Sequence, residues 1–277
     1  MSRDRPHPPR PAMDPLTLLA ANLAIALILF TGLWAIAQLT RDPSFVDAFW
    51  AFGITVLAVS SFLLAQGWEP RQLVITGLVA VWGLRLGFHL FLRWRREGAD
   101  PRYAALLASA REKRGWSHGK TTALFVFAPQ ALLLWITALP AQLGQVSLQA
   151  GFGPVAYAGI ALAVFGIVYE TVADAQLAAF KHDPANSGKV MDRGLWAWSR
   201  HPNYFGEAAA WWGIWLIGAE TMPGLFAVAG PVFLTFTLTR WSGAPLLERS
   251  VRKRRPGYDA YAERTPSFIP RPPRRET

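Results

Sequence analysis

The sequence predicts an all-α integral membrane protein that crosses the bilayer about seven times. Of its 277 residues, 52% are hydrophobic and only 17% are charged, whereas a soluble domain carries about 25% charged residues. The apolar residues fall in runs of roughly 20, the length that a helix needs to cross about 30 Å of hydrocarbon. Nearly all Lys and Arg residues lie between these runs. This separation of apolar and basic stretches is typical of a polytopic membrane protein.

The apolar runs that define the predicted spans are residues 16–39, 45–66, 72–92, 121–142, 153–180, 203–219 and 222–241. One seven-helix membrane domain is therefore expected over residues 16–270, without a second, soluble domain. A Pro- and Arg-rich arm at residues 1–15 is expected to be disordered, and a basic tail follows at 271–277. The first run is too long for a secretory signal peptide.

The positive charges give the spans an orientation. If the loops alternate between the two sides, 23 of the 28 Lys and Arg residues lie on one side of the membrane. The positive-inside rule makes that side cytoplasmic, with the N-terminus outside and the C-terminus inside. We expect the inner membrane of a prokaryotic cell. The topology signal together with attraction to anionic lipid accounts for most of these Lys and Arg residues, and a phosphate-binding surface at specific positions is the alternative.

Ionisable side chains inside spans are costly, and each is therefore a candidate functional group. They are Asp47, Arg85, His89, Glu170, Asp174 and Glu207. The two in the third span are four residues apart and share a helix face, as do the two in the fifth. Gly83 and Gly87 predict that another helix approaches the third span closely. The alternative is a buried network without chemistry, in which Arg85 neutralises Asp47 or Glu170.

A denser polar cluster precedes and enters the sixth span. Pro202 suits the first turn of a helix, and Ser199 is placed to cap that turn. The free backbone N–H groups of the turn, with Arg200 and His201 beside them, would bind phosphate or carboxylate. Asn203 shares a face with the acid four residues later, and the two would bind hydroxyl or amide groups. The alternative is that Arg-His-Pro only marks the membrane boundary.

Five segments carry a resemblance to a known family. They are Ser44-Phe45-Val46-Asp47-x-x-Trp50, Asp100-Pro101-Arg102-Tyr103, Glu170-x-x-x-Asp174-x-Gln176, Arg200-His201-Pro202-Asn203-Tyr204-Phe205-Gly206-Glu207 with Trp211-Trp212-Gly213, and Tyr258-x-x-Tyr261-x-x-x-Thr265-Pro266-x-Phe268-Ile269-Pro270. Together they resemble the steroid 5-alpha-reductase family, and its bacterial branch in particular, over nearly the whole chain after about residue 40. Isoprenylcysteine carboxyl methyltransferases share the Arg-His-Pro-x-Tyr core and a similar tail.

The resemblance implies a cytoplasmic half that encloses NADPH and a lipid-accessible cavity for an apolar substrate. In the reductases, hydride goes to the β-carbon of a carbon–carbon double bond conjugated to a carbonyl, and a Glu–Tyr pair polarises the carbonyl oxygen. The resemblance assigns the cofactor aspartate to Asp174, the cofactor asparagine to Asn203 and three basic positions to Lys181, Lys189 and Arg240. With the polar cluster included, the predicted cofactor residues are Asp174, Lys181, Lys189, Arg193, Arg200, His201, Asn203, Tyr204, Glu207 and Arg240.

The catalytic part of the family pattern differs in this chain. The family's tyrosine falls three residues before Arg85, where Trp82 has no acidic hydroxyl. The glutamate partner has no clear match, and Asp47 is the nearest acid. His89 or Tyr204 would supply the proton instead, so the predicted catalytic residues are Asp47, His89 and Tyr204. The five His residues are too scattered to predict a metal site.

Three functions remain open from the sequence. The first is a monomeric, NADPH-dependent membrane reductase of a steroid-like or other enone-like lipid. The second is a methyltransferase that uses S-adenosylmethionine and holds it with Arg200, His201, Tyr204 and Glu207. The third is a non-enzymatic scaffold or lipid-binding protein. Nucleic acid is not an expected partner, because the basic residues adjoin spans rather than a soluble recognition module.

Overall fold

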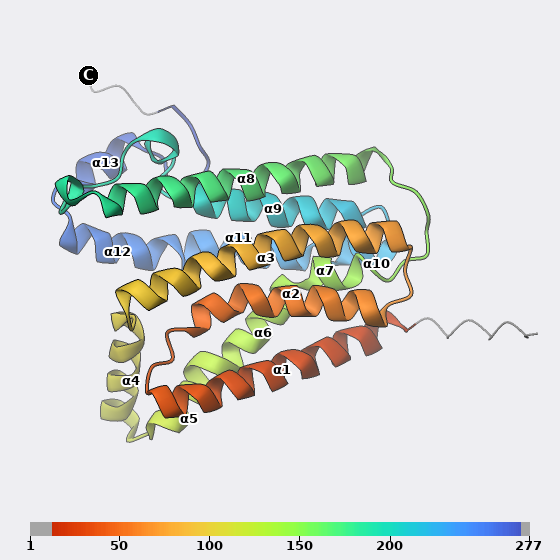
Figure 1. Ribbon diagram of the computed structural model, residues 1–277, viewed down its shortest axis with the longest axis horizontal. Helices are drawn as coiled ribbons and strands as arrows, with labels where there is room; N and C mark the ends of the chain where they lie inside the picture. Colours follow the sequence, from red (N-terminus) through yellow and green to blue (C-terminus); the bar gives the residue numbers. More distant parts are fainter. Residues whose placement is uncertain (1–12, 273–277) are drawn as a thin grey trace, which may run out of the picture.

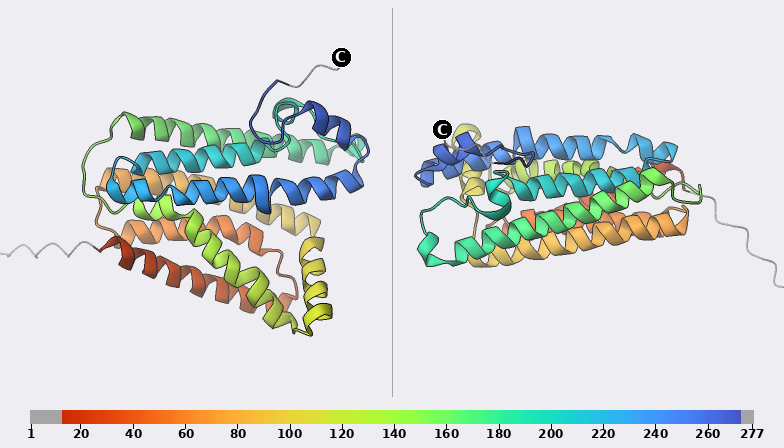
Figure 2. Two further views of the ribbon diagram at one scale, coloured as in Figure 1. Left: turned by 180° about the vertical axis from the view of Figure 1, so that it is seen from behind. Right: turned by 90° about the horizontal axis from the view of Figure 1, so that it is seen from above.

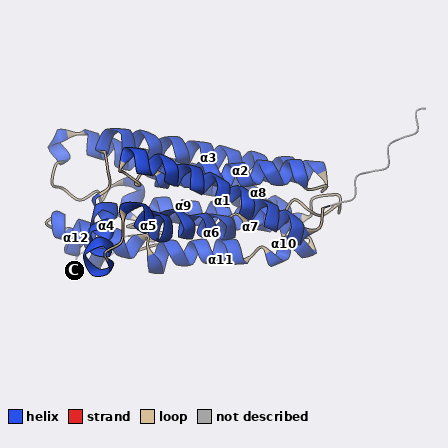
Figure 3. Ribbon diagram, turned by 90° about the horizontal axis from the view of Figure 1, so that it is seen from below, coloured by secondary structure: helices blue, strands red, loops and turns tan. Residues whose placement is uncertain are grey.

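The computed structural model describes residues 13–272, and within them all regular structure is helical, without a strand (Figure 3). The long helices lie side by side along one axis (Figures 1 and 2). This confirms the all-α prediction. The expected disorder of the N-terminal arm concerns residues that, up to residue 12, lie outside the described part, as do residues 273–277 of the basic tail.

Six helical stretches are long and apolar enough to cross a membrane, namely Pro15–Thr40, Val46–Leu64, Glu69–Glu97, His118–Thr137, Pro154–His182 and Met222–Arg254. The remaining predicted span forms α9 (Pro202–Gly218), which has 17 residues, fewer than the roughly 20 of a full perpendicular crossing. The protein is therefore an integral membrane protein by the length and apolarity of its helices, and six rather than seven of them meet the requirement.

Besides α9, four of the long helices are continuous. They are α1 (Pro15–Thr40), α2 (Val46–Leu64), α3 (Glu69–Glu97) and α8 (Pro154–His182). The fourth pass is divided into α5 (His118–Thr122), the π-helix η1 (Ala123–Phe127), α6 (Ala128–Thr137) and α7 (Leu139–Leu143). The last is divided into α10 (Met222–Phe226), α11 (Ala229–Phe236), the π-helix η4 (Thr237–Trp241) and α12 (Ala244–Arg254).

Three α-helices fall outside the predicted spans. They are α4 (Pro101–Arg114), α13 (Tyr258–Arg264) and α12, which begins after the last predicted span. Helix α4 runs across the end of the bundle instead of along it (Figure 1). Asp100 caps its first turn by accepting the Arg102 N–H at 2.8 Å, and Gly115 ends it in the left-handed conformation, with φ of 64°. Capping residues and a terminal glycine predict a helix, but the segment lacks the long apolar run that identifies a span.

The two ends of the bundle differ in charge. The basic end is where α3 and α8 finish, where α9 begins and where α4 and α13 lie, and it carries the basic segments 93–120, 181–200 and 249–264. The far end carries the short loops 65–68, 144–153 and 219–221. Every connection between consecutive passes lies at one of these ends, so polar loops are kept away from the middle of the bundle.

Glycines allow two pairs of helices to pack with their backbones close together. A β-carbon on Gly83 of α3 would lie 2.1 Å from Thr55 Oγ1 of α2, which confirms the expected close approach to the third span. A β-carbon on Gly166 of α8 would lie 2.3 Å from the Ala210 nitrogen of α9. Because α9 is held directly against α8, the polar side chains near the basic ends of both helices are brought together.

Large apolar side chains point out of the bundle along its length. Ile28 and Leu39 of α1 are 71% and 85% exposed, Phe88 of α3 is 57% exposed and Val168 of α8 is 56% exposed. Such extensive apolar exposure would cause aggregation in water, but it suits a surface in contact with acyl chains.

Candidate functional site

A buried cluster of charged side chains joins α3, α8 and α9 toward the basic end. One nitrogen of Arg85 lies 2.6 Å from a Glu170 oxygen, and another lies 2.7 Å from an Asp174 oxygen. Trp82 donates its indole N–H to Glu170 at 3.0 Å, and Asn203 donates its amide N–H to Asp174 at 3.2 Å. The structure therefore brings two predicted cofactor residues, Asp174 and Asn203, into direct contact.

Glu207 adds a third carboxyl group to this cluster and has no partner for it. It lies one turn beyond Asn203 on α9 and is only 8% exposed. Its charge interacts with that of Glu170 and with that of Arg85, yet it forms no hydrogen bond or ion pair with any residue of the described range 13–272. With one arginine facing three carboxyl groups, the cluster has an excess of acid and needs a proton or an external donor.

A second polar group lies where α4 meets α2. Tyr103 donates its hydroxyl to Asp47 at 2.6 Å and accepts the Gln130 amide N–H at 3.1 Å. Arg102 lies 3.4 Å from Asp47 and 2.7 Å from Asp100. Burial, and then the adjacent charge of Asp47, raises the pKa of the Tyr103 phenol. This phenol therefore stays protonated and holds the Asp47 carboxylate in place.

The two groups are joined by the predicted catalytic residues. The Tyr204 ring stacks on His201, with centroids 5.3 Å apart and planes 9° apart. Tyr204 interacts electrostatically with both Glu207 and Asp47. Its hydroxyl forms no hydrogen bond within residues 13–272. A phenol without a hydrogen-bond partner in the described residues is thus close enough to both the acidic cluster and the Asp47 group to interact with their charges.

His89 of α3 lies on the same side, one turn beyond Arg85. It interacts electrostatically with Asp174 and Arg85 and also with Arg93, and it makes no hydrogen bond to another described residue. The three predicted catalytic residues and the three predicted cofactor residues Asp174, Asn203 and Glu207 are therefore gathered in one region, between α2, α3, α4, α8 and α9.

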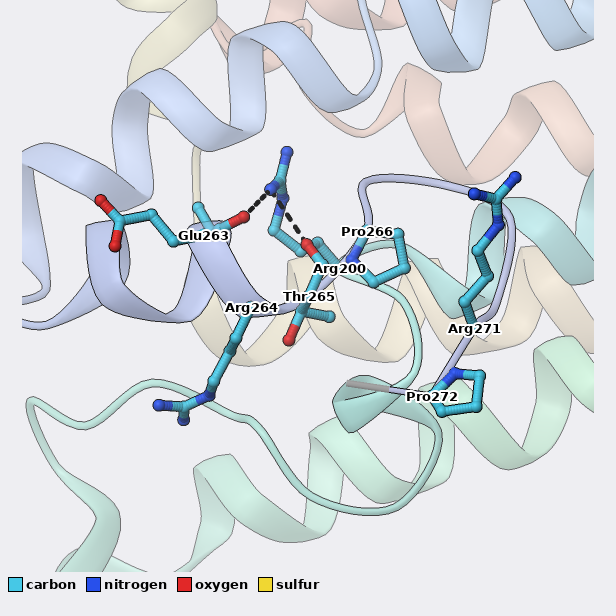
Figure 4. A pocket seen from close by; sticks show the side chains of 8 residues that line it. Arg200, Glu263, Arg264, Thr265, Pro266, Arg271 and Pro272 are labelled. Carbon is cyan, nitrogen blue, oxygen red and sulfur yellow. Dashed lines mark hydrogen bonds between the residues drawn. The ribbon is translucent and has the colours of Figure 1, made fainter. Parts of the chain in front are cut away.

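Arg200 and His201 have a different environment from the one the sequence suggested. Arg200 pairs with Glu248 at 3.0 Å and donates to the carbonyl oxygens of Ala262 and Thr265 at 2.7 and 3.1 Å (Figure 4). His201 lies 2.9 Å from the same Glu248. Both side chains thus fasten the start of α9 to α12 and α13, and most of their donors are already occupied. A binding role for them stays a prediction.

Pro202 occupies the first position of α9, as expected, but the prediction that Ser199 caps this turn is wrong. The N-cap residue is His201, which makes no side-chain cap. Ser199 instead accepts the His201 backbone N–H at 3.1 Å and donates to the Phe268 carbonyl at 2.8 Å. The Ser199 hydroxyl is thus bonded to the tail after α13. Local sequence patterns cannot predict a contact with a segment so distant in the chain.

A cavity of about 270 Å³ lies between Arg200, α13 and the tail, with Glu263 and Arg271 on its wall (Figure 4). Arg264, also at this cavity, pairs with Asp192 at 2.6 Å. The cavity is enclosed by the C-terminal segment and is not lined by the residues of the acidic cluster.

The other predicted basic residues lie outside the cluster. Lys181 is about two turns beyond Asp174 on α8 and lies 3.5 Å from Glu97. Arg193 donates to Asn186 at 3.2 Å. Lys189 and Arg240 are exposed, and their side chains contact no acid within residues 13–272. The structure places all four at the basic end without joining them to one another.

Sequence reasoning did not select four residues that the structure places in this region. They are Trp82, Tyr103, Gln130 and Glu248. The Asp100-Pro101-Arg102-Tyr103 segment was a signal for Tyr103, because it starts a capped helix directly after a span. Trp82 was considered only as the replacement of a tyrosine, although an indole N–H is a buried donor that must find an acceptor.

Helices able to cross a membrane, with ionisable side chains buried between them, define an α-helical integral membrane protein with a polar internal site. The chain belongs to the family described as "Protein of unknown function (DUF1295)", whose model matches residues 33–265. This family is the steroid 5-alpha-reductase-like group. An uncharacterized protein of Schizosaccharomyces pombe is 23% identical over 282 residues, covering 90% of this chain and 79% of the relative. No solved structure matches the chain.

Proposed function

We propose that the protein is a membrane-embedded, NADPH-dependent reductase of a carbon–carbon double bond conjugated to a carbonyl in an apolar, steroid-like or other lipid. The observation that carries the proposal is the buried Glu207 carboxyl, which lacks a protein partner beside the Asp174–Asn203 contact. The steroid 5-alpha-reductase-like family supports it. The site belongs to the basic end, which we propose is cytoplasmic, where NADPH is found.

The residues fit the chemical groups of NADPH. Glu207 offers an acceptor to an amide or ribose hydroxyl donor, and Asn203 offers an amide. Lys189 and Arg240 have side chains free for phosphates at the same end, and cations of this kind bind phosphate through charge-assisted hydrogen bonds. When bound, NADPH supplies a hydride for the β-carbon of the substrate.

The protein supplies the proton and polarises the carbonyl. Tyr204 has an unoccupied hydroxyl that would donate a hydrogen bond to the substrate carbonyl oxygen, which gains negative charge as the hydride arrives. Asp47 is oriented by Tyr103 and Arg102 at 2.6 and 3.4 Å, and with His89 it would relay a proton from the basic end. With the hydride that bound NADPH would supply, the double bond would gain one hydride and one proton.

A second candidate function is methyl transfer from S-adenosylmethionine. The specific observation in its favour is the acid excess of the cluster, in which Arg85 alone faces Glu170, Asp174 and Glu207. A sulfonium and an ammonium group would neutralise such a site, whereas NADPH brings further negative charge. The two candidates therefore make opposite use of Glu207.

Thermal unfolding in mild detergent with NADPH, NADH or S-adenosylmethionine distinguishes them, because a ligand of the native state raises apparent stability by mass action. The reductase proposal expects a shift with NADPH that Glu207→Gln and Asn203→Ala abolish. Glu69→Gln, at the far end of α3, is the matched control and should retain the shift. A shift with S-adenosylmethionine alone would overturn the reductase proposal and support methyl transfer.

We propose further that α9 also crosses the membrane, which gives seven passes, an external N-terminus and a cytoplasmic C-terminus in a prokaryotic inner membrane. The chain contains no cysteine, so single cysteines can be introduced without a background. Cysteines at Gln149 and Lys253 should react with an impermeant maleimide from opposite sides of oriented vesicles. Labelling of both from the same side would contradict seven passes.

A further inference from the structure

Two cations and two aromatic rings are packed together where α4 turns into α5. The rings of Trp116 and Phe125 stack with centroids 5.5 Å apart and planes 22° apart. The Arg114 guanidinium lies 4.9 and 5.2 Å from these two centroids, and the Lys120 ammonium lies 4.5 Å from that of Trp116. We call these four residues the α4–α5 corner.

The corner lies where the chain passes from the basic end into the apolar bundle. Helix α4 runs across that end, and the following pass then runs along the bundle (Figures 1 and 2). Leu124 and Phe125, about one helical turn after Lys120, are 49% and 38% exposed. Aromatic rings beside cations at such a boundary are typical of the headgroup level of a bilayer.

Contacts with α1 fix the position of the corner. Trp34 donates its indole N–H to the Gly119 carbonyl at 3.0 Å, and Gln38 donates to Thr122 Oγ1 at 3.1 Å. Thr121 and Thr122 are buried. Lys120 therefore extends from a firmly held turn, and the cost of ordering it at a ligand is reduced.

The cations of the corner have no acidic partner. Neither Arg114 nor Lys120 forms an ion pair or hydrogen bond through its side chain within residues 13–272. Arg111 and Lys113 add positive charge nearby, and Glu112 is the one acid between Arg111 and Lys120. Stacking on a ring uses the face of a guanidinium and leaves its N–H edge available for the oxygens of a phosphate.

We propose that the α4–α5 corner binds the phosphate of an anionic phospholipid headgroup, whose acyl chains lie along the exposed side chains of Leu124 and Phe125. The cations supply charge complementarity, and the rings hold them at the depth of the headgroup. The proposal is independent of the reaction at the acidic cluster, because none of the corner residues belongs to that cluster.

Native mass spectrometry of the full chain, in micelles containing phosphatidylglycerol and phosphatidylcholine, tests the proposal. The protein should retain phosphatidylglycerol preferentially, and the double variant Arg114→Gln/Lys120→Gln should bind it about thirtyfold more weakly, given the worth of each of the two cations near a lipid surface. Lys253→Gln/Arg254→Gln removes equal charge from exposed positions of α12 and is the matched control, which should bind as the unaltered protein does.

Three results would overturn the proposal. One is equal loss of phosphatidylglycerol in the corner variant and the control, which would indicate a diffuse charge effect. Another is equal retention of phosphatidylcholine. The third is displacement of the bound lipid by millimolar glycerol phosphate, which would indicate a site for soluble phosphates. Unfolding temperatures in neutral detergent must agree between the two variants, and since all four substituted side chains are exposed, we expect them to agree.

Discussion

Helix α3 carries one buried and one partly buried arginine, and their environments differ. Arg71, at the far end, is 1% exposed and donates to two carbonyl groups of the loop before α8 at 2.8 and 2.9 Å. Arg85, toward the basic end, instead faces the carboxyl groups of Glu170 and Asp174. Arg71 holds a loop in place through hydrogen bonds to its backbone, whereas Arg85 lies among carboxyl groups, which can gain or lose protons.

The same contrast extends to the acids of the two ends. Glu220, at the far end, accepts the backbone N–H groups of Gly153, Val155 and Ala156 at 2.8 to 3.2 Å and so caps the start of α8. Glu207 has no partner in the described residues. A buried polar group that is satisfied by backbone stabilises the fold, while one left unsatisfied needs another explanation, which for Glu207 is the ligand proposed above.

The largest expected effect is that of Arg85→Met. The change leaves Glu170 and Asp174 without their cation in a buried site, and breaking such a pair from one side costs about 3–5 kcal/mol. Equilibrium unfolding in mixed micelles, monitored by circular dichroism, measures the loss of unfolding free energy.

A double variant sharpens this prediction. In Arg85→Met/Glu170→Gln one of the abandoned charges is removed as well, so part of the lost stability should return. If the double variant is less stable than Arg85→Met alone, the cation and the carboxylate do not compensate each other in the way their 2.6 Å contact implies.

Arg71→Met is expected to have the next largest effect, about 3 kcal/mol, because two hydrogen bonds from a charged donor are lost. The ligand-induced shift of the unfolding temperature should remain, since the loop that Arg71 holds is at the far end. If Arg71→Met lost ligand binding while its stability stayed unchanged, Arg71 would belong to the binding site and would not serve to hold the loop. The same unfolding assay with and without ligand decides between these results.

The fold was largely predictable from the sequence. Apolar runs predicted six of the membrane-spanning stretches, since a helix in lipid must satisfy its own backbone and therefore follows composition closely. The α9 span remains one of the proposals above, because its 17 residues fall short of a full crossing. Helix α4 was missed because it lies across the bundle, where no long apolar run is needed.

The candidate site was only partly predictable. The spacing of Glu170 and Asp174 placed them on one face, but their contact with Arg85 depends on how α3 packs against α8. In the alternative without chemistry, Arg85 neutralises Asp47 or Glu170, and the structure shows it in contact with Glu170. Asp47 turns instead to Tyr103, whose position is set by the loop into α4 and follows from no periodicity.

Tyr103→Phe tests whether the Asp47 group belongs to the functional end or to the scaffold. It removes a hydrogen bond to Asp47 and one from Gln130. We expect the free energy of unfolding to fall by about 1 kcal/mol. Tyr157→Phe on α8 is the matched control, because that side chain is 62% exposed and its hydroxyl makes no hydrogen bond within residues 13–272. If Tyr103→Phe and Tyr157→Phe lost the same free energy of unfolding, the hydrogen bonds of Tyr103 would not contribute to stability.

The smallest effect is expected at Asp100, the N-cap of α4. Burial alone would raise the pKa of its carboxyl, but hydrogen bonds from the Arg102 side chain and backbone outweigh burial and lower it. Because the pKa is lower in the folded protein, the contribution of Asp100 to stability is complete above its unfolded value of about 4 and is lost as the pH falls through the folded value.

Asp100→Asn keeps a good capping side chain and removes the charge. The variant should be less stable than the unaltered protein at pH 7, and the difference should shrink as the pH falls below about 4. Unfolding temperatures measured across pH 3–7 in a nonionic detergent provide the comparison. Asp192→Asn, which alters a second carboxylate–arginine pair at the same end, is measured alongside. A difference that stays constant with pH would mean that Asp100 acts through its cap geometry and that its charge adds nothing to the anchoring of α4.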